Sequence, residues 1–313
     1  AETANRYSSS YDAAGGELSG QRTEYTFETV DFQLAEPTRV GYTFTGWKVT
    51  GAAAGSAGVA TSGTVSTVKQ GTWGNLSCVA TWRANQYPVA LDAAFPEFAM
   101  GATYEGYGPY GVSKDGGTAS VTATFDSAMP AATMPHATGY AFEGYFDDAG
   151  VKYYNADGSS ARTWDKPNAA TLHGRWTLDR YELTLDVGNG EVPDAAGRGW
   201  VRDAGEAGLY RLSYSIEYVK ESGGSPRIQL PVSAAKPGYS VFDGWTGPNL
   251  AKPSTRVQVQ PWELVSKAYT GVFSGLIDYT ATLDLAGGRF EAAPEGWAEA
   301  GGPRAHGCTV EAE

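Results

Sequence analysis

The sequence contains few cysteines and histidines and carries little positive charge. Its 313 residues include two cysteines, Cys78 and Cys308, in distant parts of the chain. Two such cysteines cannot build the disulfide framework of a small secreted domain, and they do not have zinc-ligand spacing. Lysine and arginine total 23 against 35 acidic residues, a net charge of −12. This acidity disfavours binding to nucleic acid and to anionic bilayers.

Long apolar runs and catalytic motifs are also missing. No stretch of about 18 consecutive apolar residues is present, so we expect no membrane span in this chain. The three histidines, His136, His173 and His306, lie far apart in sequence. We find no nucleophile elbow, phosphate loop or dinucleotide fingerprint. The sequence therefore predicts no catalytic residue, no cofactor and no metal site, and we expect a protein that is not an enzyme.

What the sequence does contain is internal repetition. One phrase has the form Gly-Tyr-x-Phe-x-Gly-[Trp/Tyr] and occurs at 41–47, 139–145 and, with one extra residue, 238–245. A second phrase opens with tyrosine, closes with aspartate and occurs at 7–12, 87–92, 181–186 and 279–284. Self-similarity on this scale predicts an array of similar modules.

The two phrases divide the chain into three complete repeats and a partial fourth. The predicted boundaries are 1–83, 84–177, 178–274 and 275–313. Four residues separate each of the closing residues Trp82 and Trp176 from the tyrosine that opens the next repeat. Linkers this short predict an elongated, semi-rigid array.

Within each repeat the sequence predicts β-structure and little helix. Apolar and polar residues alternate at 181–186, which predicts a half-buried strand. In the first repeat we expect a second strand near 23–34, with Tyr25 and Phe27 facing inward. In the third we expect one near 210–219. The only helical turn that we predict lies near 159–165.

The extra residue in the third copy of the first phrase changes the expected strand geometry. It interrupts the two-residue alternation between Val241 and Phe242. An interruption of this kind predicts a β-bulge at that point. Cys78 falls at an inward strand position equivalent to Leu172 and Tyr269, which predicts a buried, unreactive thiol.

The aromatic residues leave two interpretations open. Trp47, Trp245 and the equivalent Tyr145 recur in register, which favours core packing over stacking on a sugar. Loops carry function when a scaffold holds them. The candidates for an exposed ligand contact therefore lie in the inserts that differ between repeats: Tyr107, Tyr110 and Trp200.

Two kinds of chemistry remain open from the sequence. Asp147-Asp148 and Asn155-x-Asp157-Gly158 supply oxygen ligands of the kind that Ca²⁺ takes, but the same residues form metal-free Asx turns. A Lys–Asn isopeptide bond requires a buried lysine, and buried lysines are uncommon. The sequence alone does not decide whether calcium sites or isopeptide bonds exist.

The combined order of elements resembles a known family. The segment Pro-x-x-x-Gly-Tyr-x-Phe-x-Gly-Trp at 37–47, followed by a closing strand that ends in Ala80-Thr81-Trp82, is similar to the Listeria–Bacteroides repeat, or internalin-type B-repeat, of bacterial cell-surface proteins. The third repeat departs from it by its extra residue and by Phe273 in place of the closing tryptophan. The resemblance covers nearly the whole chain. It implies mainly β (α+β), β-grasp-like modules and transfers neither catalytic residues nor a partner.

These observations favour an extracellular, non-enzymatic stalk, spacer or adhesin segment of a wall-attached or secreted bacterial surface protein. The alternative is a carbohydrate- or glycoprotein-binding (mucin-binding) module that uses the inserts at 96–117 and 195–208. Its partners would be host or bacterial surface glycans or glycoproteins. A third hypothesis, an enzyme with two carboxylates meeting across repeats, requires a pocket that brings them together. We expect a monomer. The ligand, the mode of anchoring and the flanking domains do not follow from the sequence.

Overall fold

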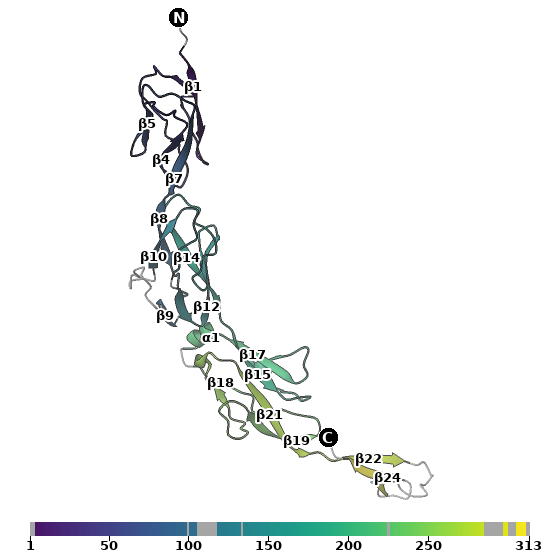
Figure 1. Ribbon diagram of the computed structural model, residues 1–313. Helices are drawn as coiled ribbons and strands as arrows, with labels where there is room; N and C mark the ends of the chain where they lie inside the picture. The colour runs from purple at the N-terminus through teal and green to yellow at the C-terminus, as the bar shows by residue number, and fades with distance from the viewer. Residues whose placement is uncertain are drawn as a thin grey trace. The chain divides into compact units, whose positions relative to one another are not determined.

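The computed structural model describes residues 4–98, 100–104, 118–132, 134–223, 226–284, 297–299 and 305–310. These residues are mainly β-strand (Figure 1). The chain forms two compact units. Unit 1 contains residues 1–97, 101–137 and 141–177, and unit 2 contains residues 98–100, 138–140 and 178–313. The predicted division into four repeats is finer than this and stays a prediction.

The first sheet of unit 1 has the strand order β2-β1-β7-β4. Its strands are β1 (Arg6–Asp12), β2 (Glu24–Thr26), β4 (Tyr42–Thr50) and β7 (Leu76–Ala84). A small separate sheet has the order β3-β6-β5 and consists of β3 (Phe32–Gln33), β5 (Val59–Ser62) and β6 (Val65–Val68).

The second large sheet has the order β10-β8-β14-β12-β11-β9, with β13 paired to β12. Its strands are β8 (Gln86–Asp92), β9 (Met100–Tyr104), β10 (Thr118–Thr124), β11 (Pro135–Thr138), β12 (Tyr140–Phe146), β13 (Lys152–Asn155) and β14 (Ala170–Leu178).

The main sheet of unit 2 has the order β16-β17-β15-β21-β19. Its strands are β15 (Tyr181–Asp186), β16 (Val201–Arg202), β17 (Leu209–Tyr214), β19 (Tyr239–Thr246) and β21 (Lys267–Leu276). The other elements are the 3-10 helices η1 (Ala196–Arg198) and η2 (Pro261–Glu263), the helix α1 (Ile216–Glu221), the pair β18 (Ile228–Gln229) and β20 (Gln258–Val259), and a sheet of β22 (Tyr279–Asp284), β24 (Ala305–Val310) and β23 (Trp297–Glu299).

The three main sheets share one pairing pattern. In each, the strand that opens the repeat pairs antiparallel with its second strand and parallel with the closing strand. A parallel pair cannot be made by a hairpin, so the intervening chain must cross over. The parallel registers are Tyr11–Cys78, Leu91–Leu172 and Leu185–Tyr269. The predicted equivalence of Cys78, Leu172 and Tyr269 is therefore confirmed.

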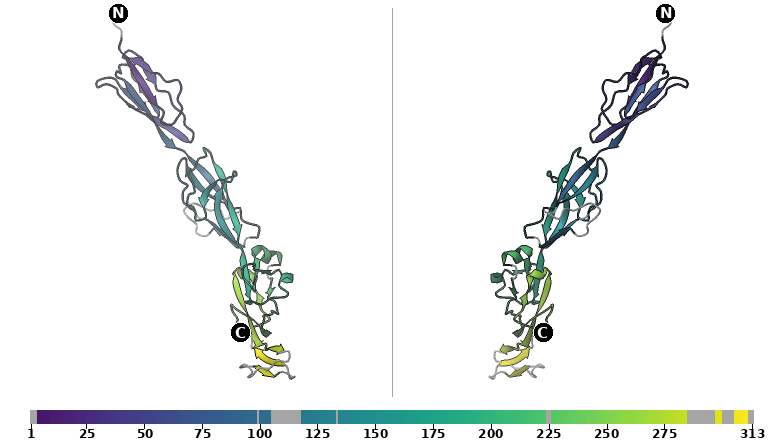
Figure 2. Two further views of the ribbon diagram at one scale, coloured as in Figure 1. Left: turned by 90° about the vertical axis from the view of Figure 1, so that its right-hand side faces the viewer. Right: turned by 90° about the vertical axis from the view of Figure 1, so that its left-hand side faces the viewer.

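The described residues form three hydrophobic clusters rather than one shared interior. One lies between Tyr7 and Trp82, one between Tyr87 and Leu172, and one between Tyr181 and Phe273. Figure 2 shows the sheets that carry these clusters from two further sides. Trp47, Tyr145 and Trp245 are all buried, which confirms the prediction that these recurrent aromatics are core residues.

An aromatic pair of the same kind, a phenylalanine and the Trp or Tyr three residues later, belongs to each cluster. Phe44 packs on Trp47, Phe142 on Tyr145 and Phe242 on Trp245, edge to face, with ring centroids 5.5, 5.1 and 5.1 Å apart. Residues three apart on a regular strand point to opposite faces. A backbone irregularity must therefore turn both rings inward.

The glycine of the phrase provides that irregularity. Gly46, Gly144 and Gly244 have φ values of +130°, +131° and +125°, which only glycine adopts readily. The ladder register shifts between Phe44 and Gly46 and again between Phe242 and Gly244. The bulge is therefore a shared feature of the first and third copies and explains the glycine there.

The bulge predicted between Val241 and Phe242 is wrong. Both residues stay in register with β21, and Tyr239 pairs with Leu276. In the first repeat the corresponding strand begins one residue closer to its phenylalanine, with Tyr42 paired to Ala84. The extra residue is absorbed as one more ladder position because the closing strand continues far enough to pair with it.

Two of the predicted strands end earlier than expected. In the first repeat β2 stops at Thr26, and the chain turns so that Phe27 is 54% exposed rather than inward. In the third, β17 stops at Tyr214 and α1 follows, burying Ile216 and Val219 at helical spacing. Both segments alternate apolar and polar residues, so periodicity alone did not locate the turn.

The helical turn predicted near 159–165 is also wrong. The segment makes isolated β-bridges through Ser160, Thr163 and Trp164. Trp164 is fully buried, so tertiary packing determines its conformation.

Candidate functional site

The first two residues of each phrase, Gly41–Tyr42, Gly139–Tyr140 and Gly238–Tyr239, are called the Gly–Tyr pairs here. The first pair lies in unit 1, beside the connection between two sheets. Strand β7 ends at Ala84 and β8 begins at Gln86. The intervening Asn85 donates its N–H to the Gly41 carbonyl at 2.9 Å and accepts the Phe125 N–H at 2.9 Å. The connection is therefore held on both sides by the backbone.

Side chains complete the contact at the first pair. The rings of Tyr42 and Phe125 meet edge to face with centroids 5.6 Å apart. A Cβ atom on Gly41 would lie 2.3 Å from the Phe125 ring, and Gly41 has φ +78°. Glycine is thus required both by the backbone conformation and by the close approach of the ring.

A hydrogen bond adds a polar element to this contact. The Tyr42 hydroxyl donates to Asp126 Oδ2 at 2.7 Å. This bond from the phenol to a carboxylate, followed by partial burial, raises the pKa of Tyr42 above its ordinary value of 10.0. The neutral phenol is the form that can donate, so the contact favours it.

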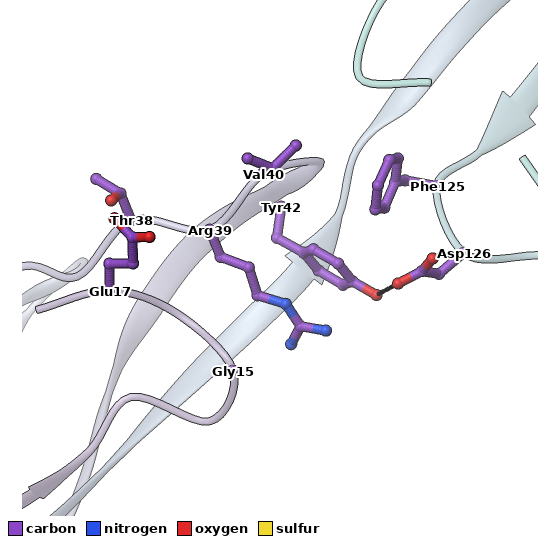
Figure 3. Close-up of a pocket in the computed structure, with 8 residues that line it drawn as sticks. All are labelled: Gly15, Glu17, Thr38, Arg39, Val40, Tyr42, Phe125 and Asp126. Atoms are coloured by element: carbon purple, nitrogen blue, oxygen red, sulfur yellow. Dashed lines mark hydrogen bonds between the residues drawn. The ribbon is translucent and has the colours of Figure 1, made fainter. Parts of the chain in front are cut away.

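A surface hollow of about 510 Å³ lies next to this contact (Figure 3). The Arg39 guanidinium stacks 3.8 Å from the centroid of the Tyr42 ring, and its Nη1 donates to the Ala14 carbonyl at 3.0 Å. Arg39 therefore packs on the Tyr42 ring in addition to Phe125. The lining residues are Gly15, Glu17, Thr38, Arg39, Val40, Tyr42, Phe125 and Asp126.

The second Gly–Tyr pair, which belongs to unit 2, makes similar contacts within that unit. The Gly139 carbonyl accepts the Asp179 N–H at 2.9 Å. A Cβ on Gly139, whose φ is +85°, would lie 2.6 Å from Ile216. The Tyr140 hydroxyl donates to Glu217 Oε1 at 3.4 Å. An apolar residue followed by an acid again meets a Gly–Tyr pair.

The third Gly–Tyr pair keeps the backbone part of this arrangement. The Gly238 carbonyl accepts the Ile277 N–H at 2.9 Å. The Lys236 ammonium lies 5.0 Å from the Tyr239 ring centroid, at the sequence position that Arg39 occupies in the first repeat. Tyr239 also packs on Phe273. Within the described part of the chain, Tyr239 has no carboxylate partner.

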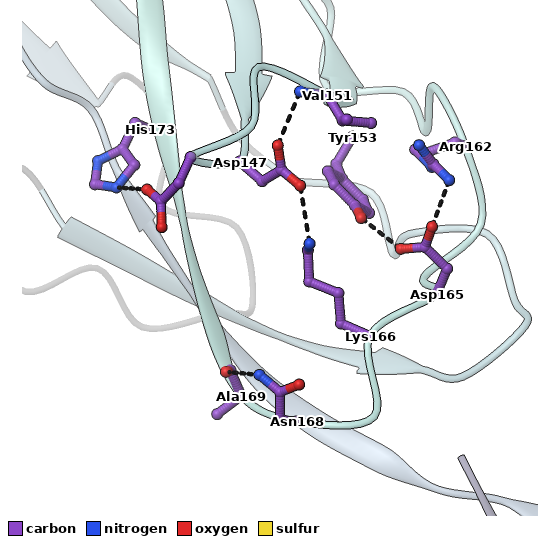
Figure 4. Close-up of polar contacts among 10 residues, drawn as sticks. Asp147, Val151, Tyr153, Arg162, Asp165, Lys166, Asn168, Ala169 and His173 are labelled. Atoms are coloured by element: carbon purple, nitrogen blue, oxygen red, sulfur yellow. Dashed lines mark hydrogen bonds and ion pairs between the residues drawn. The ribbon is translucent and has the colours of Figure 1, made fainter. Parts of the chain in front are cut away.

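A second group of polar side chains lies in the second repeat (Figure 4). Lys166 Nζ pairs with Asp147 Oδ2 at 2.8 Å, and the Val151 N–H donates to Asp147 Oδ1 at 2.8 Å. Burial opposes ionisation of Asp147, but these two partners outweigh it and lower the pKa of Asp147. Of the predicted oxygen ligands, Asp147 is therefore held by a lysine and a backbone amide.

The nearby Tyr153 is part of the same group. Its ring is buried, and its hydroxyl donates to Asp165 Oδ1 at 2.5 Å, while Arg162 pairs with the other oxygen of Asp165. Burial, and then the bond to Asp165, raise the pKa of Tyr153 to about 12. Every member has a partner, which is the arrangement expected of a structural network.

The remaining candidate ligands form local contacts. His173 lies between Asp92 at 3.2 Å and Asp148 at 3.3 Å. Asp157 accepts the Ser159 N–H at 2.9 Å, as in a metal-free Asx turn. Among the residues that the structure describes, no three His, Cys, Asp or Glu side chains gather as metal ligands. Cys78 is fully buried as predicted, and burial raises its pKa to about 11.

The three predicted ligand contacts have different outcomes. Tyr107 and Tyr110 lie outside the described residues. Trp200 is 3% exposed, so the expectation of an exposed ring is wrong. The 3-10 helix η1 and Gly199, with φ +79°, turn the chain at this point. The backbone N–H of Trp200 donates to the Ala195 carbonyl at 3.0 Å, and the indole ring packs into the core.

Trp200 nevertheless borders a surface cavity in unit 2. The cavity measures about 410 Å³. Within the described residues, the buried indole N–H of Trp200 has no hydrogen-bond partner and the exposed Arg198 makes no ion pair. The sequence analysis identified Trp200 as a candidate, but it did not identify Arg198 or Arg227, which also line this cavity. The lining residues are Arg198, Gly199, Trp200, Leu212, Ser213, Tyr214, Tyr218, Arg227, Ile228 and Gln229.

Comparison with known proteins identifies part of the chain. Residues 7–69 match the Listeria-Bacteroides repeat domain, which confirms the resemblance for this segment. This repeat family is typical of bacterial surface proteins. No curated protein and no solved structure matches the chain. In the described ranges, no helix has the length and apolar character needed to cross a membrane.

Proposed function

We propose that this chain, whose residues 7–69 carry a Listeria–Bacteroides repeat, is an extracellular segment of a bacterial surface protein that acts without catalysis as a stalk, spacer or adhesin. The observation that carries the proposal is the family match together with three sheets of the same strand pattern. The parallel pairing of opening and closing strands supports β-grasp-like repeats: three complete ones and a partial fourth.

The proposal includes an extended arrangement of the repeats. The Asn85 connection and its backbone hydrogen bonds support it for the first two repeats, because a one-residue linker held at both sides restricts motion. Three repeats in line would span on the order of 100 Å, whereas a compact globule of this length would span roughly 50 Å.

Small-angle scattering of the purified chain tests the arrangement. We expect a maximum dimension near the larger of these two values. A maximum dimension near the smaller one would contradict the stalk. Antibody labelling of intact bacteria that produce the parent protein tests the location, with protease-shaved cells as the control; absence of accessible epitope would contradict an extracellular segment.

A second candidate function is binding of surface glycans or glycoproteins, mucins included. The specific observation that favours it is the cavity beside Trp200, which combines Arg198 and Arg227 with the exposed face of Tyr218. Aromatic faces and charged hydrogen-bond donors are suited to a sugar that bears an acidic group.

A glycan array with the wild-type chain and Arg198→Ala tests this second function. We expect binding to acidic glycans that falls about tenfold in the variant, since a charged hydrogen bond is lost. Arg6→Ala, a change at another exposed arginine, is the matched control. Equal binding by both variants, or no binding by the wild type, would contradict a glycan site in this cavity.

A further inference from the structure

The strands that open and close each repeat are direct neighbours. Residues 9–12 of β1 pair with residues 76–79 of β7, and β8 with β14 and β15 with β21 also pair over four positions. Because the two strands are parallel, the chain enters the opening strand at one end of the pair and leaves the closing strand at the other end. Tension along the chain therefore pulls the strands past each other and loads all the hydrogen bonds between them at once.

A tryptophan side chain extends this pairing in the first two repeats. The Trp82 indole N–H donates to the Ala13 carbonyl at 3.0 Å, and the Trp176 indole N–H donates to the Ala93 carbonyl at 2.8 Å. Each carbonyl belongs to the residue that follows the last paired position of the opening strand. The bond therefore joins the closing strand to the end of the opening strand and is loaded together with the ladder.

The aspartate at the end of the second phrase fixes the position of this acceptor. In each complete repeat its Oδ1 accepts the backbone N–H of the residue two positions later. These bonds join Asp12 to Ala14, Asp92 to Ala94 and Asp186 to Gly188, at 2.8, 3.0 and 2.8 Å. Such an Asx turn holds the residue between its two ends, which in the first two repeats carries the acceptor carbonyl. The recurrent aspartate and the closing tryptophan therefore serve the same contact.

The third repeat keeps the parallel pair but lacks the tryptophan bond. Phe273 occupies the position of Trp82 and Trp176, four residues beyond Tyr269. A phenylalanine side chain has no N–H group. The carbonyl of Val187, which follows the opening strand of this repeat, therefore receives no such bond from residue 273.

We infer that each parallel pair is a mechanical clamp that keeps its repeat folded while the chain is pulled from both ends, and that the tryptophan bond strengthens the clamp in the first two repeats. The inference rests on the proposed stalk function, because a stalk carries tension between its two ends. Unfolding under force is governed by the unfolding rate. A contact slows unfolding when it has to break before the barrier is crossed, and the clamp is such a contact.

The neighbours of the closing strand indicate where the first repeat yields. β7 also pairs with β4, over eight positions, which is twice as many as it shares with β1. Under tension β1 therefore separates from β7 while β7 stays attached to β4. The contacts between β1 and β7, the Trp82 bond included, set the force that the first repeat withstands.

Single-molecule pulling of the full chain through handles at its two ends tests the clamp. When a clamp opens, the residues between its strands extend. In the first repeat about 70 residues extend, which gives a step of roughly 240 Å. The other two repeats release about 85 residues each and give steps of roughly 290 Å. The shorter step therefore identifies the first repeat in every record.

Removal of the indole N–H tests the tryptophan bond. Trp82→Phe should unfold the first repeat about fivefold faster at the same force, since one hydrogen bond of the clamp is lost. Thr72→Val is the matched control, because it removes a buried hydroxyl that bonds to the Gly58 and Lys69 carbonyls, outside the clamp. It should lower stability in urea, as Trp82→Phe does, but change the rate under force less than about twofold.

A change of pulling direction tests the parallel geometry itself. Ser19 is exposed and lies in the loop after β1. A handle at Ser19 in place of the N-terminal one loads the clamp from one end, so its hydrogen bonds break one after another. The first repeat should then unfold at a force at least about twofold lower, whereas the two longer steps stay unchanged.

Two results would each overturn the inference. One is an equal unfolding force of the first repeat for the two handle positions. The other is an equal effect of Trp82→Phe and Thr72→Val on the unfolding rate under force. Because the purified chain is pulled, neither result depends on where the protein lies in the cell, which antibody labelling tests separately.

Discussion

The turns at Thr26–Thr29 and Thr124–Ser127 have similar sequences, Thr-Phe-Glu-Thr and Thr-Phe-Asp-Ser, and in both the fourth residue donates its N–H to the carbonyl of the first at 3.1 Å, but their surroundings differ. The second turn contacts Gly41 and Tyr42, and the first leaves Phe27 largely exposed. Similar local sequence is therefore compatible with two turn conformations, because Asp126 has φ +55° whereas the equivalent Glu28 does not have a positive φ. The aromatic residue is better buried in the turn that a Gly–Tyr pair contacts. Changes at equivalent positions of the two turns separate the contribution of the turn from that of the contact.

The largest effect is expected from a methyl group at the close approach. Gly41→Ala places Cβ against the Phe125 ring, whereas Gly20→Ala, at a similar φ of +76°, meets open space. Both variants lose stability through backbone strain of about 1 kcal/mol, but Gly41→Ala should lose roughly 1–3 kcal/mol more through the clash. Urea unfolding measures the difference. Equal losses would show that the close approach contributes nothing.

Removing the aromatic ring from each turn should give the next largest effect. Phe125→Ser should lower the free energy of unfolding by about 1–2 kcal/mol, since the apolar contact with Tyr42 is lost. Phe27→Ser should change it by less than about 0.5 kcal/mol, because Phe27 is already 54% exposed. Thermal unfolding of the two variants compares them. A larger loss at Phe27 would reverse the comparison.

The hydrogen bond to Asp126 predicts a pH dependence. Since the pKa of Tyr42 is raised above 10.0 by this bond, the folded state favours the neutral phenol. The contribution of this bond to stability is complete below pH 10.0 and is lost as the pH rises through the pKa of folded Tyr42. In Asp126→Asn the pKa should fall toward the ordinary value, which NMR titration of Tyr42 can follow. An unchanged pKa would contradict the assigned cause.

Much of the β-architecture could be predicted from periodicity and repetition. Tyr181, Leu183 and Leu185 alternate as a half-buried strand should, and the strand is present. The recurrence of Trp47, Tyr145 and Trp245 identified three core positions. These predictions succeed because a repeated aromatic on a strand has to be buried in every copy.

The errors have a common physical origin. Phe27 and Ile216 continue an alternating pattern, yet each follows the residue at which its strand ends. Trp200 was expected on the surface because it lies in an insert, but the turn at Gly199 directs it into the core. Periodicity reports which side a residue would face on a strand, and it carries no information about where tertiary contacts end that strand.

The sequence alone does not predict the contact between Gly41–Tyr42 and Phe125–Asp126 either. The two segments lie far apart in sequence, and no charge or aromatic pattern in either segment predicts that it contacts the other. The signal that could have found it is the recurrence of an apolar residue and an acid at a fixed offset from the second strand, as in Phe125–Asp126 and Ile216–Glu217. That offset becomes visible only once the strand registers are known.

A double-mutant cycle at the first Gly–Tyr pair tests the central claim that the pair and the turn are energetically coupled. Tyr42→Phe, Asp126→Asn and the double variant are unfolded in urea, with Tyr239→Phe combined with Asp126→Asn as the control cycle. The account predicts a coupling of about 0.5–1 kcal/mol between Tyr42 and Asp126 and none in the control. Additive effects in both cycles would contradict it.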